Sequence, residues 1–117
     1  MKLIVLSAVV ATLIMSGCNS TPPMYEYGEY SESYYALKKE SGEQSNSEWK
    51  ASLEEVIELS NARAIRVPPG VFANLGYIHL KSNNNEKAIQ YFEREKSTYP
   101  EATKFMDNLI KKAKLQG

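Results

Sequence analysis

Hydrophobic residues recur three and four positions apart through most of the chain after residue 28, as they do on the buried face of an amphipathic helix. The clearest stripe is formed by Trp49, Leu53, Val56, Ile57 and Ser60. The pattern predicts helices over residues 28–42, 47–64, 69–81, 85–98 and 100–115. No segment shows the strict alternation that is typical of a strand. We therefore expect an all-α fold of about five antiparallel helices.

Turn-forming residues mark the ends of these helices. Ser47 is a favourable N-cap, so residues 43–46 are expected to form a polar loop. Pro68 cannot donate a backbone hydrogen bond, and Pro69 fits the first position of the next helix. The last helix is expected to begin at Pro100. Its inward positions are predicted to be Phe105, Met106, Leu109, Ile110 and Ala113.

Residues 69–102 resemble the tetratricopeptide repeat, a 34-residue helical hairpin with the pattern W-x2-L-G-x2-Y, A-x3-F and P. The matching residues are Phe72, Leu75, Gly76, His79, Ala88, Phe92 and Pro100. Gly76 predicts a close approach of two helices opposite Ala88. His79 replaces the usual Tyr and is expected to be buried, and Glu95 stands where a small residue is usual. We expect tetratricopeptide-like hairpins with a C-terminal capping helix; a generic helical hairpin is the alternative.

The first 18 residues are similar to the signal of a bacterial lipoprotein. A basic Lys2 precedes an apolar run over residues 3–15, too short to span a membrane, and Ser16 and Gly17 precede the single cysteine, Cys18. The expected organisation is a cleaved signal peptide at 1–17, a lipidated Cys18 with a spacer at 18–27, and a helical domain at 28–117. The alternative is an ordinary secretory leader and a buried cysteine.

The chain is small and has balanced charge. It has 117 residues with 14 basic and 14 acidic side chains, so no basic excess favours nucleic-acid binding. It contains no nucleophile elbow or phosphate-binding loop. His79 is the only histidine, so a histidine-based metal site would need carboxylates or Cys18 as further ligands, and Cys18 is expected to be acylated. Glu54, Glu55 and Glu58 fall on the expected solvated side of their helix. We therefore expect no enzyme activity, no catalytic or metal-binding residues and no cofactor beyond the diacylglycerol and N-acyl chain on Cys18.

The chain resembles a family of small, uncharacterised bacterial outer-membrane lipoproteins with a tetratricopeptide-like domain. The resemblance depends on residues 15–18, 25–30, 67–70 and 74–77, and it covers nearly the whole mature chain. Asn19 in place of Asp after the cysteine is similar to the outer-membrane sorting signal. Genes of this family tend to lie beside those of lipoproteins that resemble the curli secretion channel. The resemblance therefore implies a periplasmic, membrane-anchored protein with such a channel-like lipoprotein as its partner.

Two surfaces are candidate interaction sites. The first helix of a tetratricopeptide unit lines its concave side, which predicts a protein-binding groove formed by Ala73, Asn74, Tyr77, Leu80 and Lys81. Alternatively, Tyr77 contacts the helix over 47–64.

The second surface is an aromatic patch at Tyr27, Tyr30 and Tyr34. These side chains either pack on the helix over 47–64 or form a patch that binds a partner.

These observations together predict an adaptor in an envelope or surface-assembly system, anchored in the outer membrane by its lipid and facing the periplasm. Its expected partners are envelope proteins, and a stack of so few repeats also predicts self-association. The alternative is a lipoprotein cofactor of a peptidoglycan-synthesis enzyme. The spacer over 19–23 reaches only about 17 Å, which disfavours that alternative.

Overall fold

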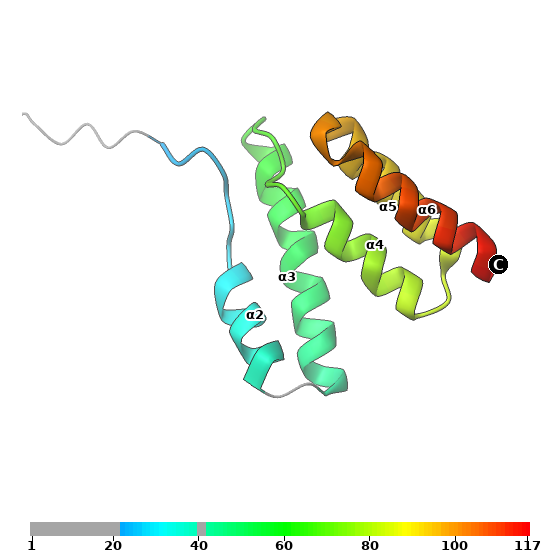
Figure 1. The fold of residues 1–117 in the computed structure, drawn as a ribbon. Coiled ribbons are helices and arrows are strands. Elements are labelled where there is room, and N and C mark those ends of the chain that lie inside the picture. The colour runs from blue at the N-terminus through cyan, green and yellow to red at the C-terminus, as the bar shows by residue number, and fades with distance from the viewer. Residues whose placement is uncertain (1–21, 40–41) are drawn as a thin grey trace, which may run out of the picture.

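The computed structural model describes residues 22–39 and 42–117, which form helices joined by short connections (Figure 1). Helix α2 covers Tyr30–Lys39, α3 covers Glu43–Ala62, α4 covers Val71–Lys81 and α5 covers Asn85–Thr98. A 3-10 turn, η1, over Pro100–Ala102 leads into α6, Thr103–Gln116. The described residues contain five α-helices and no strand, so the predicted all-α class is confirmed. The expected signal peptide at 1–17 and Cys18 lie outside the described residues.

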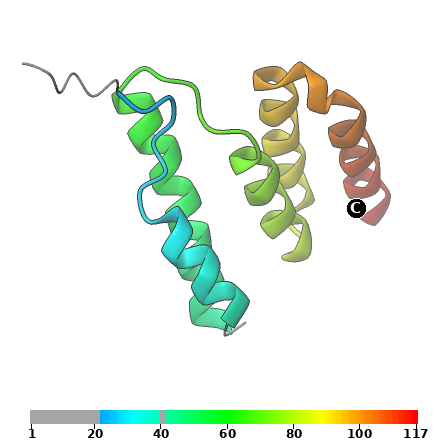
Figure 2. The ribbon, with the colours of Figure 1, turned by 60° about the vertical axis from the view of Figure 1, so that its left-hand side comes forward.

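Each helix packs mainly against the helices that precede and follow it in the sequence. Helix α2 runs antiparallel along α3, α4 along α5, and α5 along α6 (Figures 1 and 2). The segment over 63–70 crosses from the end of α3 to the start of α4. The molecule is therefore a short stack with two open ends, one at the α2–α3 pair and the other at α6.

Two buried hydrophobic clusters hold the stack together. The first joins α3 to the start of α4 and consists of Trp49, Leu53, Val56, Val67, Val71, Phe72 and Leu75. The second joins α4, α5 and α6 and consists of Leu80, Ala88, Phe92, Met106, Ile110 and Ala113. Helix α4 contributes to both clusters and is therefore the central element of the core.

Gly76 permits a close approach of α4 to α5 beside the second cluster. A Cβ atom at this position would lie 2.5 Å from Cε1 of Phe92 and 3.1 Å from the Ala88 carbonyl oxygen. Both distances are shorter than an ordinary van der Waals contact, so a larger side chain would push α5 away from α4. The close approach predicted from Gly76 and Ala88 is confirmed.

The starts of α3 and α4 differ from the prediction. Helix α3 begins at Glu43, with Gly42 as its N-cap, so the loop predicted over 43–46 is wrong. Ser47 lies inside the first turns, and its hydroxyl donates to the Gln44 carbonyl oxygen at 2.9 Å instead of capping the helix. Helix α4 begins at Val71 and not at Pro69, because Gly70 adopts a left-handed conformation (φ 88°) that ends the preceding segment.

The inward positions predicted for the last helix are right except for one. Met106, Ile110 and Ala113 are buried, and Leu109 packs against them. Phe105 is 62% exposed. It lies one residue before Met106, which rotates its side chain about 100° away from the buried side of the helix. The start at Pro100 is also modified, because residues 100–102 form the separate turn η1.

Replacement of Gly76 by alanine tests the close contact between α4 and α5. Alanine is the better helix former by about 1 kcal/mol, but its methyl group would overlap the Phe92 ring. We expect Gly76→Ala to lower the free energy of unfolding by about 1–2 kcal/mol, measured by urea denaturation and circular dichroism. Adding Phe92→Leu should cost less in the Gly76→Ala variant than in the wild type. Equal or greater stability of Gly76→Ala would contradict the assigned contact.

Candidate functional site

A groove of about 410 Å³ opens between the carboxyl-terminal halves of α4 and α6. Both helices pack on α5, so they run in the same direction and their last turns lie near each other. The lining residues are Tyr77, Leu80, Lys81, Asn83, Lys112 and Gln116. No carboxylate is among these lining residues, so the two lysines give the groove a positive character.

Tyr77 is the main aromatic surface of this groove. Its side chain is 48% exposed, and the Lys81 ammonium lies 5.6 Å from the centre of its ring. Leu80 is buried beneath it in the second core cluster. Phe105 lies on the same side of α6 as Lys112, seven residues earlier, so a second exposed aromatic ring follows the groove along α6.

The structure brings together three of the five residues predicted for the groove, namely Tyr77, Leu80 and Lys81. Asn74 lies nearer the start of α4, where its side-chain amide donates to the Gly70 carbonyl oxygen at 2.8 Å. Ala73 packs against the second core cluster. Neither of these two lines the groove.

Sequence reasoning misses the contribution of α6 to this groove. In the sequence, the lysines near the end of the last helix are explained by their favourable interaction with the helix dipole. Lys112 and Gln116 therefore do not stand out as site residues. The repeat pattern itself could have indicated the contribution of α6. If α6 takes the place of the first helix of a further repeat, it lies beside α4, and its exposed residues at steps of four and seven face the same groove as those of α4.

The tyrosines near the amino-terminal end differ in their contacts. The Tyr30 ring centre lies 4.8 Å from that of Trp49, and burial raises the pKa of Tyr30. Tyr34 also contacts Trp49, at 5.5 Å, while Tyr27 meets Tyr30 edge to face at 5.5 Å. Tyr27 and Tyr34 nevertheless remain exposed. The described contacts therefore include the predicted packing on α3, and they leave an exposed aromatic edge.

Tyr99 holds the segment that connects α3 and α4. Its hydroxyl donates to the Val67 carbonyl oxygen at 2.6 Å, and burial raises the pKa of Tyr99. The Tyr25 hydroxyl lies 3.5 Å from the Tyr99 hydroxyl, and Glu26 pairs with Arg63 at 2.6 Å. Tyr25 and Glu26, which were expected in the spacer, thus contact the helical domain.

Glu95, near the end of α5, has a buried carboxylate that lies beside the start of α4. It is 3% exposed, and its Oε1 accepts the Gly70 backbone N–H at 2.7 Å, while Oε2 has no hydrogen-bond partner. Burial raises the pKa of Glu95, and the N–H groups of Gly70 and its neighbours in α4 oppose that increase. The residue that departs from the repeat pattern therefore stabilises the helix start, since free N–H groups at that end attract an anion.

His79 is buried between helices, as expected. Its ring stacks on that of Tyr91 with centres 5.5 Å apart, and its Nε2 has no hydrogen-bond partner. Burial lowers the pKa of His79, and the nearby Lys87 and Lys50 lower it further. Across residues 22–39 and 42–117, no group of three or more His, Cys, Asp or Glu side chains is placed to hold a metal ion.

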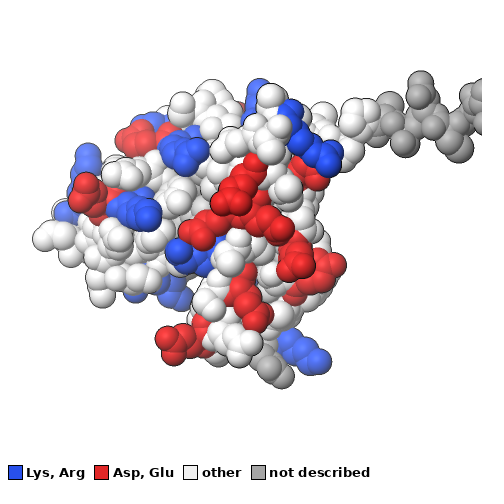
Figure 3. Space-filling model, turned by 180° about the vertical axis from the view of Figure 1, so that it is seen from behind, with Lys and Arg blue, Asp and Glu red and all other residues white. Residues whose placement is uncertain are grey.

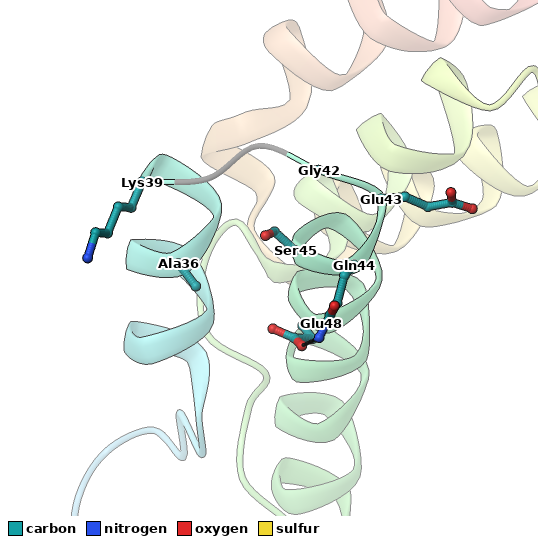
Figure 4. A pocket seen from close by; sticks show the side chains of 7 residues that line it. All are labelled: Ala36, Lys39, Gly42, Glu43, Gln44, Ser45 and Glu48. Atoms are coloured by element: carbon teal, nitrogen blue, oxygen red, sulfur yellow. Dashed lines mark hydrogen bonds between the residues drawn. The ribbon is translucent and has the colours of Figure 1, made fainter.

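A larger hollow of about 600 Å³ lies between the end of α2 and the start of α3 (Figure 4). Its side chains do not converge on one point, since Lys39 and Glu43 point away from the space between the helices. It also borders residues 40–41, which lie outside the described part of the chain. We therefore take the α4–α6 groove as the candidate site.

Comparison with known proteins identifies one family. A family model described as "Domain of unknown function (DUF4810)" matches residues 24–109. No curated protein and no solved structure shows a significant match. Within the described residues, none of the helices has the length and apolar character needed to cross a membrane.

Glu95 makes the stability of the fold depend on pH. The pKa of Glu95 is raised above 4.5 in the folded state, so the folded protein holds a proton on this carboxyl group more strongly than the unfolded chain does. The contribution of Glu95 to stability is therefore greatest at low pH and decreases as the pH rises above about 4.5. Glu95→Gln keeps an acceptor for Gly70 but cannot ionise. We expect its melting temperature, relative to the wild type, to increase from pH 4 to pH 7.

The control for this measurement is Glu95→Ala, which also removes the acceptor and should lose about 1–3 kcal/mol. If the difference in melting temperature between Glu95→Gln and the wild type is the same at both pH values, Glu95 is not the titrating group.

Proposed function

Because the chain belongs to the DUF4810 family, whose description assigns no activity, we propose its function from its own sequence and geometry together. The proposed function is that of a lipid-anchored adaptor that binds another protein in the α4–α6 groove. We propose that it is a bacterial lipoprotein of the outer membrane, facing the periplasm. Its partner would belong to an envelope or surface-assembly system, such as a channel-like lipoprotein.

The tetratricopeptide-like part of the proposal is supported by the contacts of the repeat residues. The space beside Gly76 is too small for a Cβ atom, which would overlap the Phe92 ring and crowd the Ala88 carbonyl oxygen, and Phe72 and Leu75 are buried beside α3. In addition, each helix packs mainly on its neighbours in the sequence, as expected of a stack of helical hairpins. Such stacks bind extended or helical peptides on the side lined by the first helix of each hairpin.

The single observation that carries the binding proposal is the exposed Tyr77 in a groove that Lys81 and Lys112 also line. Tyrosine gives a large apolar surface at low entropic cost, which is typical of residues that contribute most to binding. The two lysines, with no carboxylate among the lining residues, favour a partner segment with acidic side chains. An acidic segment with an apolar residue that packs on Tyr77 would satisfy both features.

The anchoring part of the proposal depends on Cys18 and on the contacts that follow it in sequence. Tyr25 and Glu26 are held against Tyr99 and Arg63, so only six residues separate Cys18 from the domain. Six residues span at most about 25 Å between Cys18 and Tyr25. A domain tethered so closely favours a partner in or on the same membrane, whose local concentration the anchor raises.

A lipoprotein cofactor of a peptidoglycan-synthesis enzyme is the second candidate. The short connection between Cys18 and Tyr25 disfavours it, because such a cofactor has to reach from the membrane toward the cell wall. The two candidates differ in the identity of the protein that contacts Tyr77, which can be measured.

We expect a photo-crosslinking amino acid at Tyr77 of the full chain, in living cells, to give one dominant adduct with an envelope protein. The same group at Glu58, which is exposed on α3 and does not line the groove, should not give this adduct. Mass spectrometry of the adduct identifies the partner. Cys18→Ala should abolish the adduct if anchoring brings the two proteins together.

A charge change tests whether the groove itself binds. Lys112→Glu should lower the yield of the Tyr77 adduct by roughly fivefold, because it introduces a carboxylate into a groove lined by lysines. The matched control is Lys114→Glu, the same change on the same helix outside the groove. Only self-adducts, or equal loss in both variants, would contradict the proposed binding site, and an adduct with a peptidoglycan enzyme would favour the second candidate.

A further inference from the structure

The two halves of the described chain carry opposite net charges. Residues 22–39 and 42–64 contain eight carboxylates and four cations, a net charge of −4. Residues 65–117 contain five carboxylates and nine cations, a net charge of +4. Viewed from behind, a run of acidic side chains crosses the right-hand half of the surface (Figure 3). The near-zero total charge therefore results from two separated regions of opposite sign.

The acidic region contains a cleft at the α2–α3 end of the stack. The cleft has a volume of about 400 Å³ and is lined by Glu29, Ser33, Glu48, Ala51, Ser52 and Glu55. Glu29 and Glu48 are exposed, and Glu55 accepts the Glu29 backbone N–H at 3.4 Å. No ion pair of the described residues includes any of these three carboxylates. The cleft is thus an acidic surface whose lining residues include no cation.

A basic stripe lies on α6 at the other end of the stack. Lys104, Asn108, Lys111 and Leu115 follow one another at steps of four, three and four residues, so they lie on one side of the helix. All four are exposed, and they lie opposite the buried Met106, Ile110 and Ala113. Leu115 is 79% exposed. Neither Lys104 nor Lys111 forms an ion pair within the described residues.

The spacing of the two sets of charges matches. Lys104 and Lys111 are seven residues apart on α6, and Glu48 and Glu55 are seven residues apart on α3. At 1.5 Å per residue, each pair spans about 10.5 Å along its helix. A helix laid in the cleft can therefore place one lysine near each carboxylate in either direction.

We propose that the basic stripe of α6 in one copy of this chain binds the acidic cleft between α2 and α3 of a second copy. A second copy is the occupant that fits because both surfaces occur on one molecule, at opposite ends, with matched charge spacing. The contact is heterologous, joining two different surfaces, so an open assembly of any length keeps one free cleft at one end and one free stripe at the other. Copies would assemble end to end into a ring or a short filament, leaving the α4–α6 groove open on each of them.

The contact is tested in cells that express two differently tagged copies of the full chain, with a photo-crosslinking amino acid at Leu115. We expect adducts between the two tags, with the attachment mapped by mass spectrometry to residues 29–59. Lys104→Glu with Lys111→Glu, or Glu48→Lys with Glu55→Lys, should each lower the adduct yield roughly tenfold, because each pair of changes replaces attraction by like-charge repulsion. In isolated membranes, raising the salt concentration to about 0.5 M should lower the yield in the same direction.

Co-expression of the two reversed variants provides the decisive measurement. With the crosslinker in the Lys104→Glu, Lys111→Glu copy, its acidic stripe meets the basic cleft of the Glu48→Lys, Glu55→Lys copy, and the adduct between them should return to near the wild-type yield. This recovery also shows that both variants fold. The matched controls Lys114→Glu on α6 and Glu58→Lys on α3 should leave the wild-type adduct unchanged.

The proposal is overturned if the reversed pair does not recover the adduct, if the charge variants have no effect, or if Leu115 crosslinks only to other proteins. Because the groove residues Tyr77 and Lys112 are not changed here, the failure of this contact does not affect the test of the proposed adaptor function, and the converse also holds.

Discussion

The position of α4 depends on two contacts made by the end of α5. Glu95 accepts the backbone N–H of Gly70, and Tyr99 donates to the carbonyl oxygen of Val67, so two residues four positions apart hold both ends of one short connecting segment. These bonds fix the segment over 67–70 to the end of α5. Helix α4 contributes to both hydrophobic clusters. The position and direction of its first turn therefore set how the α2–α3 pair is aligned with α5 and α6.

The polar contacts also show a balance of opposing effects. Burying the Glu95 carboxylate is unfavourable, and its Oε2 has no partner, but the hydrogen bond to Oε1 and the electrostatic field at the start of α4 offset part of the cost. His79 is buried in the same core with a lowered pKa. At low pH, Glu95 favours the folded state because its carboxyl group is then neutral. His79 disfavours the folded state at low pH, because the buried histidine must remain uncharged while the unfolded chain can bind a proton there.

Much of the fold follows from local patterns in the sequence. The five helices are visible in the spacing of hydrophobic residues, and the contact of Gly76 with Phe92 follows from the need for a small residue where helices approach closely. The start of α3 is mispredicted because Ser47 is a residue type that favours the N-cap position. The actual N-cap is Gly42, which has no side chain to cap the helix, and the helix begins at Glu43. The exposure of Phe105 escapes prediction because periodicity assigns a broad side of a helix and not its edges.

The candidate site is only partly predictable for a related reason. Tyr77, Leu80 and Lys81 belong to one helix, so their common side follows from their spacing alone. Lys112 and Gln116 join them only because α6 packs on α5 parallel to α4, and this is a property of the tertiary structure. The bonds of Glu95 and Tyr99 likewise link residues 25 and 32 positions apart, which no local pattern specifies.

The absence of any fully buried residue in α2 has a consequence for the order in which the molecule opens. This helix packs mainly on α3, so its detachment breaks the fewest buried contacts and should be the first step of local unfolding. The step uncovers Trp49, which Tyr30 and Tyr34 shield and which is the single tryptophan of the chain. The indole is therefore a natural fluorescent reporter of the amino-terminal end, and its emission should change before the α4–α6 core melts.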